Sequence, residues 1–137
     1  MGVKMTVDYV GQLNCKARHG PSSAELDTDA PTDNCGRGLS FSPSDLLGTS
    51  LLSCALTTMA IKGSKLGIPF ENASGGVVKE MHTEGPRRVA QLEVEIEMPA
   101  GLEPEARTQL ESIAKRCPVA LSLHPDLKIP ISFVYPD

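Results

Sequence analysis

The segment from Pro43 to Leu66 constrains the fold most, because it predicts one long helix in a short chain. Ser42 is a favourable N-cap, and the proline that follows it suits the first helical turn. Lys65 suits the negative end of the helix dipole, and Gly67 ends the helix. At about 1.5 Å of rise per residue, this helix would be roughly 35 Å long.

Apolar side chains surround the axis of this helix almost completely. A helix that is apolar all round is normally buried on all sides, and a chain of 137 residues can hardly cover it alone. We therefore predict a homodimer in which a second copy covers part of the helix. The residues concerned are Leu46, Leu47, Leu51, Leu52, Cys54, Ala55, Leu56, Met59, Ala60 and Ile61.

The rest of the chain predicts strands that cluster rather than alternate with helices, which is typical of the α+β class. In the expected hairpin, Leu92, Val94, Ile96 and Met98 face inward and the glutamates between them face outward. The expected elements are strands at 4–9, 13–17 and within 22–31, the long helix, a hairpin over 75–99, a helix at 103–116, a helical turn at 119–125 and a last strand at 128–136.

Composition narrows the function classes. We expect a single domain over residues 1–137, and the net charge of -4 without a basic cluster argues against a nucleic-acid partner. No signal-peptide pattern opens the chain, and the uncharged stretch 46–61 is shorter than a membrane span, so we expect a cytoplasmic protein without a membrane partner. The four cysteines form no CxxC pair and no zinc-module spacing with histidine, so no metal or other cofactor is expected.

Cys54 and Cys117 are the candidate reactive residues. They belong to two different predicted helices, and a disulfide between them would need their Cβ atoms to lie about 4 Å apart. The sequence does not show where the helices cross, so an inert pair of core residues and a redox pair both remain open. Cys15 and Cys35 lie in a strand and a glycine-rich loop, and we interpret them as incidental.

A reactive thiol in apolar surroundings needs a nearby cation to stabilise the thiolate. Arg18 at the end of a strand and Arg37 in the loop before the long helix are both candidates, and each could equally be a solvated surface residue. His19 is typical of a turn. Asp45 either interacts with the helix dipole or orients an arginine through paired hydrogen bonds.

Two segments of the chain resemble the signature regions of a known family. They read TDAPTDNCGRGLSFSPSDLLGTSLLSCALTTMAIKG and AKRCPVALSLHP, and the hairpin KEMHTEGPRRVAQLEVEIEMP lies between them. Their combination of Ser-Pro-x-Asp-Leu, a cysteine within a helix and a distant Cys-Pro-Val resembles the OsmC/Ohr family. That family is named for osmotically inducible protein C and organic hydroperoxide resistance protein.

The resemblance implies an intertwined homodimer with long central helices and with the thiols near the subunit interface. It also implies a thiol-dependent peroxidase that reduces organic hydroperoxides. Cys54 would attack the peroxide, and Cys117 would resolve the resulting sulfenic acid to a disulfide. Arg18 would stabilise the thiolate, Asp45 would hold that arginine, and a dithiol such as a lipoyl group would reduce the disulfide.

One position departs from the peroxidase pattern. The peroxidase members carry a glutamate directly after the helix-opening proline, whereas this chain has Ser44 there and an acid one residue later, at Asp45. One residue is about 100° of rotation on a helix, so we expect a weaker arginine clamp or none. The alternative function is an OsmC-like protein that binds a small apolar or acyl ligand, or senses redox state, without peroxidase activity.

Overall fold

The structure is a computed structural model that describes residues 1–137, and the chain forms two compact units. The first comprises Met1–Leu47 and the second Gly48–Asp137. The single domain expected over the whole chain stays a prediction. Each unit contains one three-stranded sheet, which together with the helices gives the predicted α+β class.

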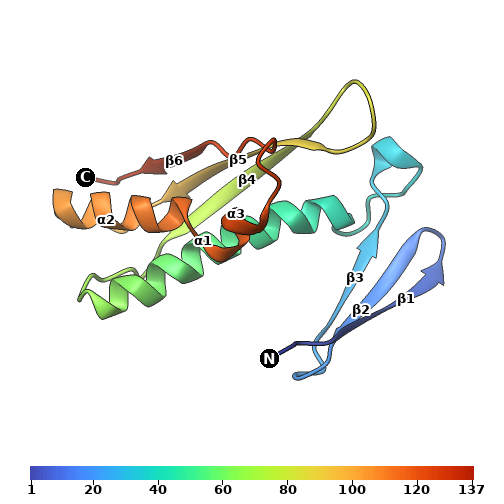
Figure 1. Ribbon diagram of the computed structural model, residues 1–137, viewed down its shortest axis with the longest axis horizontal. Helices are drawn as coiled ribbons and strands as arrows, with labels where there is room; N and C mark the ends of the chain where they lie inside the picture. Colours follow the sequence, from blue (N-terminus) through green and yellow to red (C-terminus); the bar gives the residue numbers. More distant parts are fainter. The chain divides into compact units, whose positions relative to one another are not determined.

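The first unit is an antiparallel sheet followed by a loop. Its strands are β1 (Met5–Gly11), β2 (Asn14–His19) and β3 (Glu25–Asp29), in the order β1-β2-β3 (Figure 1). All three were expected, and β1 and β2 each run two residues further than predicted. The following loop, expected to be irregular, contains one 3-10 turn, η1 (Thr32–Asn34).

One face of this sheet is apolar and uncovered. The register pairs Val7 with Ala17 and Ala17 with Leu26, so these residues share a face with Met5 and Tyr9. The side chains of Met5, Val7 and Tyr9 are 65%, 62% and 67% exposed. A sheet of this size needs a layer against its apolar face to be stable.

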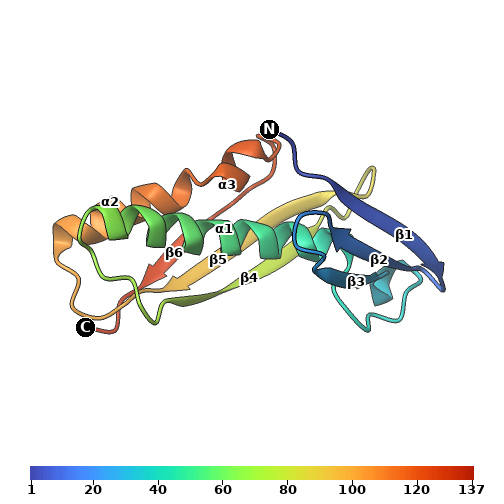
Figure 2. The ribbon, with the colours of Figure 1, turned by 90° about the horizontal axis from the view of Figure 1, so that it is seen from below.

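The second unit contains most of the long helix. Helix α1 (Pro43–Lys65) begins and ends within one residue of the prediction. The unit also contains β4 (Ser74–Met81), β5 (Val89–Glu97), α2 (Pro104–Lys115), α3 (Pro118–Ser122) and β6 (Ile131–Val134) (Figure 2). The antiparallel β4–β5 hairpin is confirmed, but β6 pairs parallel with β5 and is shorter than expected.

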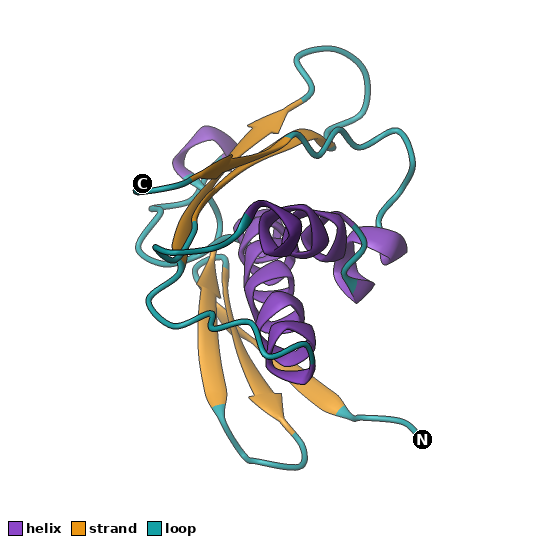
Figure 3. Ribbon diagram, turned by 90° about the vertical axis from the view of Figure 1, so that its left-hand side faces the viewer, coloured by secondary structure: helices purple, strands orange, loops and turns teal.

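The core of the second unit lies between its sheet and its helices. Leu92, Val94 and Ile96 of β5 are buried while the glutamates between them are exposed, as the alternation predicted. Because only one face of β5 is buried, α1 and α2 lie on the same side of the sheet (Figure 3). A Cβ placed on Gly48 would lie 3.3 Å from Leu92 Cδ2, so this glycine lets α1 approach β5 closely.

Helix α1 is buried on only one of its faces. The buried residues recur every three or four positions, as a single helical face requires: Gly48, Leu51, Ala55, Met59 and Gly63. Ile61 in α1 and Leu66, directly after the helix, are exposed, so one chain does not cover all of its apolar surface.

By length and composition alone, α1 could cross a membrane. It has 23 residues, and an 18-residue window within it has a mean hydropathy of 1.3. Helix α1 is therefore longer than the uncharged stretch 46–61, whose length argued against a membrane span. A core helix of a soluble protein has the same properties, so this finding is weak support for a membrane role.

Candidate active site

Cys54 lies in the middle of α1. It is half-buried and flanks Ala55, which belongs to the buried face of the helix. Its Sγ atom lies 3.8 Å from Thr58 Oγ1, one helical turn further on, where the hydroxyl can hydrogen-bond to the sulfur. Cys54 is therefore a partly accessible thiol with a polar neighbour, rather than a residue surrounded only by hydrocarbon.

Cys117 lies where α2 gives way to α3. It is the N-cap residue of α3, and its extended backbone (φ -68°, ψ 155°) turns the chain between the two helices. Pro118 directly after it suits the first position of the new helix. The side chain of Cys117 is completely buried.

The two cysteines are neighbours. Burial raises the pKa of the Cys117 thiol, and the hydrogen bond with the Cys54 side chain and the charge of Cys54 raise it further. Hydrogen bonds from the backbone N–H groups of Ala120 and Val119 lower this pKa and so partly oppose the rise. A hydrogen bond that raises the pKa of Cys117 is one in which its S–H donates to Cys54. The two side chains are therefore in contact, the protonated form of Cys117 is favoured, and neither cysteine forms a disulfide.

Cys15 and Cys35 belong to the first unit. Cys15 is half-buried in β2, and Cys35 is exposed with a left-handed backbone (φ 67°). Neither belongs to the unit that contains Cys54 and Cys117.

Arg18 also lies in the first unit, at the end of β2. Its Nη2 atom donates a hydrogen bond to Ser23 Oγ at 3.1 Å, across the turn that leads to β3. In the same turn His19 Nδ1 lies 2.6 Å from Ser22 Oγ, in agreement with its expected place in a turn.

Arg37 takes part in a network that holds the loop before α1. With the Asn14 amide oriented to satisfy its partners, its oxygen accepts from Arg37 Nη2 at 3.1 Å and its nitrogen donates to Asp29 Oδ1 at 2.8 Å. Asp29 is buried and also accepts from the Leu39 backbone N–H at 2.9 Å. Asp29 thus ties β3 to the loop, a role that the sequence analysis missed.

Asp45 caps the N-terminus of α1. Its Oδ2 atom accepts from the Ser42 backbone N–H at 2.8 Å, while Ser42 Oγ accepts from the Asp45 backbone N–H at 3.1 Å. This reciprocal arrangement is a capping box. Ser42 was expected as the N-cap, and the Asp45 carboxylate has a structural task at the helix N-terminus. Ser44 Oγ lies 3.3 Å from Ser42 Oγ.

The second unit has two cations of its own in a cleft that a neighbour of Cys54 lines. Thr58, which contacts Cys54, lines a cleft together with Lys62 of α1 and Arg116, the residue before Cys117. Neither Lys62 nor Arg116 is among the site residues predicted from the sequence. The signal that could have found Arg116 is its position directly before Cys117.

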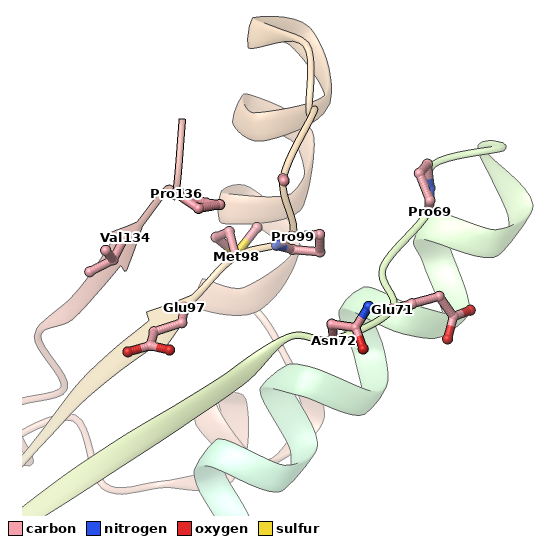
Figure 4. Close-up of a pocket in the computed structure, with 9 residues that line it drawn as sticks. Pro69, Glu71, Asn72, Glu97, Met98, Pro99, Val134 and Pro136 are labelled. Atoms are coloured by element: carbon pink, nitrogen blue, oxygen red, sulfur yellow. The ribbon is translucent and has the colours of Figure 1, made fainter.

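One open cavity of the second unit does not contain the cysteines. It has a volume of about 550 Å³ and is lined on one side by the segment after α1, with Glu71 and Asn72, and on the other by the ends of β5 and β6, with Glu97 and Val134 (Figure 4). His, Cys, Asp and Glu side chains form no group of three or more that could hold a metal ion.

An α+β fold with one cysteine within a long helix and a second, buried cysteine beside it defines the kind of site. A family profile described as OsmC-like protein matches residues 36–132. The chain therefore belongs to the OsmC-like protein family. None of the curated protein sequences compared with it matches significantly.

Solved structures agree with this assignment. The chain is 38% identical to a protein of Psychrobacter arcticus 273-4, provisionally described as an osmotic stress induced and detoxification response protein, with 97% of each chain covered and a TM-score of 0.90. The organic hydroperoxide resistance protein OsmC of Legionella pneumophila has a TM-score of 0.78 at 15% identity, covering 98% of this chain and 97% of its own. For OhrB of Bacillus subtilis the TM-score is 0.72 at 12% identity, covering 97% of this chain and 98% of its own. The last two show the shared fold alone.

Proposed function

We propose that this protein is a thiol-dependent peroxidase that reduces organic hydroperoxides. The observation that carries the proposal is that Cys117 is buried beside Cys54, so that burial and this neighbour both raise the pKa of its thiol. A thiol with a raised pKa is a poor nucleophile, so Cys54 is the attacking residue and Cys117 the resolving one. The hydroperoxide resistance proteins that share the fold point to the same substrate class.

These two thiols supply the two electrons that reduction of the hydroperoxide needs. The Cys54 thiolate attacks the outer oxygen of the hydroperoxide, the O–O bond breaks, and the organic part leaves as an alcohol after taking up a proton. Cys54 becomes a sulfenic acid, which the Cys117 thiol attacks to form a disulfide and release water. An external dithiol, such as a lipoylated protein, then reduces the disulfide and is itself oxidised.

Arg18 and Asp45 complete the proposal on the strength of the family pattern. Arg18 would stabilise the Cys54 thiolate, and Asp45 would hold that arginine. The Asp45 carboxylate also caps α1, so its substitution affects both stability and activity. This dual role means that activity must be compared among variants of equal stability.

We also propose that the working protein is a homodimer in the cytoplasm. The uncovered apolar face of the β1-β2-β3 sheet and the exposed apolar residues of α1 need a partner, and a second copy would supply it. The four free cysteines suit a reducing compartment. Light scattering after size exclusion should give twice the chain mass of 14.6 kDa.

Trapping of the sulfenic acid tests the assignment of the two thiols. Reduced C117S protein, mixed with cumene hydroperoxide and dimedone, should carry one dimedone adduct on Cys54, because no resolving thiol remains. C54S protein should carry none. A C15S/C35S variant is the matched control and should form the Cys54–Cys117 disulfide like the native chain. An adduct on Cys117 in C54S protein would contradict the assignment.

A ligand-binding or redox-sensing role is the second candidate. It is favoured by the carboxylate of Asp45, which is engaged in the helix cap, and by Ser44 at the position of the family glutamate. Native mass spectrometry of freshly purified protein distinguishes the two functions. A copurified acyl or apolar ligand together with unreactive thiols would favour binding.

A further inference from the structure

Helices α1 and α2 form a small cleft beside the thiol pair. They lie side by side, since a Cβ placed on Gly63 of α1 would be 3.5 Å from Leu110 Cδ2 of α2. The cleft has a volume of about 240 Å³. Its lining is Thr58 and Lys62 from α1 with Ser112, Ile113 and Arg116 from α2 and its C-cap.

The two cations of this cleft have no anionic partner. Neither the Lys62 ammonium nor the Arg116 guanidinium makes an ion pair or a side-chain hydrogen bond. Glu111, the acidic residue next to the cleft on α2, accepts a hydrogen bond from the Tyr135 hydroxyl instead. In a chain of net charge -4, two unpaired cations therefore line one cleft.

The helix dipoles explain the position of each cation by itself, but not why the two lie at one cleft. Lys62 lies in the last turn of α1 and Arg116 is the C-cap of α2, where basic residues are favourable. Two like charges at one cleft repel each other, and an anion between them would replace that repulsion by two attractions. The hydroxyls of Thr58 and Ser112 add hydrogen-bond donors to the same cleft.

Two lining residues of the cleft, Thr58 and Arg116, are neighbours of the two cysteines. Thr58 Oγ1 lies 3.8 Å from Cys54 Sγ, and Arg116 immediately precedes Cys117. Lys62 lies about 12 Å beyond Cys54 along the axis of α1, at the helical rise per residue. A molecule with an anionic group at one end could therefore occupy the cleft while its other end reaches Cys54.

We propose that Lys62 and Arg116 form a subsite for the carboxylate of an acyl-chain hydroperoxide. The guanidinium can take a carboxylate through two parallel hydrogen bonds, the ammonium adds a point charge, and Ile113 offers an apolar contact to the chain. The reaction is the one given above: the O–O bond breaks, Cys54 is oxidised, and a hydroxy acid leaves. This inference rests on the proposed peroxidase function for the reaction, but not for the binding of the anion.

Binding of a redox-inert probe tests the subsite without any reaction. Titration calorimetry of the reduced protein with octanoate and with octanamide, its neutral isostere, should show octanoate binding about tenfold more tightly. The K62Q/R116Q variant should lose this preference. The R88Q/K128Q variant removes two exposed positive charges elsewhere in the same unit and should keep it. Equal affinities in the native chain, or an unchanged preference in K62Q/R116Q, would overturn the proposal.

Kinetics with a hydroperoxy-octanoate and its methyl ester separate the subsite from the peroxidase function. The native chain should have a kcat/KM about tenfold higher for the acid, mainly through KM, and K62Q/R116Q should bring the ratio towards one. Equal rates for acid and ester would overturn the subsite while the peroxidase function stands. If the protein reduces neither peroxide, the peroxidase function is overturned. If octanoate is then still preferred and the preference still depends on Lys62 and Arg116, the anion subsite is supported.

Discussion

The side chains of Cys54 and Cys117 are in hydrogen-bonding contact, although the two residues lie far apart in the chain. This contact joins the middle of α1 to the junction of α2 and α3. It makes the chemical environments of the two thiols different, and each prediction about the site depends on that difference.

Removal of Cys54 should lower the pKa of Cys117. In a C54A variant the hydrogen bond and the neighbouring charge that raise this pKa are both lost, whereas burial still raises it. The pH dependence of Cys117 alkylation by iodoacetamide, followed in a C15S/C35S background, should shift to lower pH. A Thr58→Val variant retains Cys54 and should leave the Cys117 profile close to that of the native chain. An unchanged profile in C54A would contradict the contact.

Stability should fall in alkaline solution, partly through Tyr135. Burial raises the pKa of Tyr135, and its hydrogen bond to Glu111 and the charge of Glu111 raise it further. In the unfolded chain this hydroxyl ionises near pH 10, whereas the folded chain keeps the proton. The unfolded state therefore binds fewer protons above about pH 10, and the free energy of unfolding decreases as the pH rises.

A Y135F variant tests this origin. It loses the hydrogen bond to Glu111, at a cost of about 1 kcal/mol near neutral pH. It should also lose less stability than the native chain between about pH 10 and 11, because phenylalanine has no hydroxyl to ionise. Urea unfolding at several pH values measures both effects, with Tyr9→Phe in the exposed β1 strand as the control. Equal alkaline slopes for native and Y135F protein would refute the assignment.

Two adjacent glycines of β4 should respond differently to the same substitution. A Cβ on Gly75 would lie 2.7 Å from the Glu95 backbone oxygen and 3.0 Å from Leu52 Cδ1, so G75A must displace backbone. We expect a loss of about 1–3 kcal/mol of unfolding free energy. A Cβ on Gly76 meets nothing within 4 Å, so G76A should change stability by less than about 0.5 kcal/mol. Similar losses for the two variants would contradict the packing of α1 on β4.

Asp45 should contribute to stability as a cap of α1. D45A removes the acceptor of the Ser42 backbone N–H and should cost about 1 kcal/mol in denaturant unfolding. S42A removes the other half of the capping box and should cost a similar amount, and the double variant should cost less than the sum. Additive losses would show that the two hydrogen bonds are independent.

Local signals in the sequence predict the elements well. Ser42, Pro43 and Gly67 mark the ends of α1, and the alternation along β5 predicts which of its side chains are buried. These signals depend only on residues close together in the chain. The parallel pairing of β6 with β5 depends on a long connection, and no local pattern indicates it.

The site is less predictable, because it depends on where helices cross. The all-round apolar pattern of α1 does not indicate which face packs on the sheet, so the contact between Cys54 and Cys117 remained open. The same holds for Lys62 and Arg116, which come to one cleft only through the packing of α1 on α2. Family resemblance named the two cysteines, whereas their contact and the raised pKa of Cys117 required the structure.

Oxidation of the reduced protein by one equivalent of cumene hydroperoxide tests the reactivity of Cys54 most directly. Free cysteine in excess serves as the competitor, and peptide mass mapping under non-reducing conditions identifies the products. We predict loss of two thiols per chain as a Cys54–Cys117 disulfide before the free cysteine is consumed, with Cys15 and Cys35 unchanged. Oxidation of the protein no faster than that of free cysteine would contradict a peroxidase built on this pair.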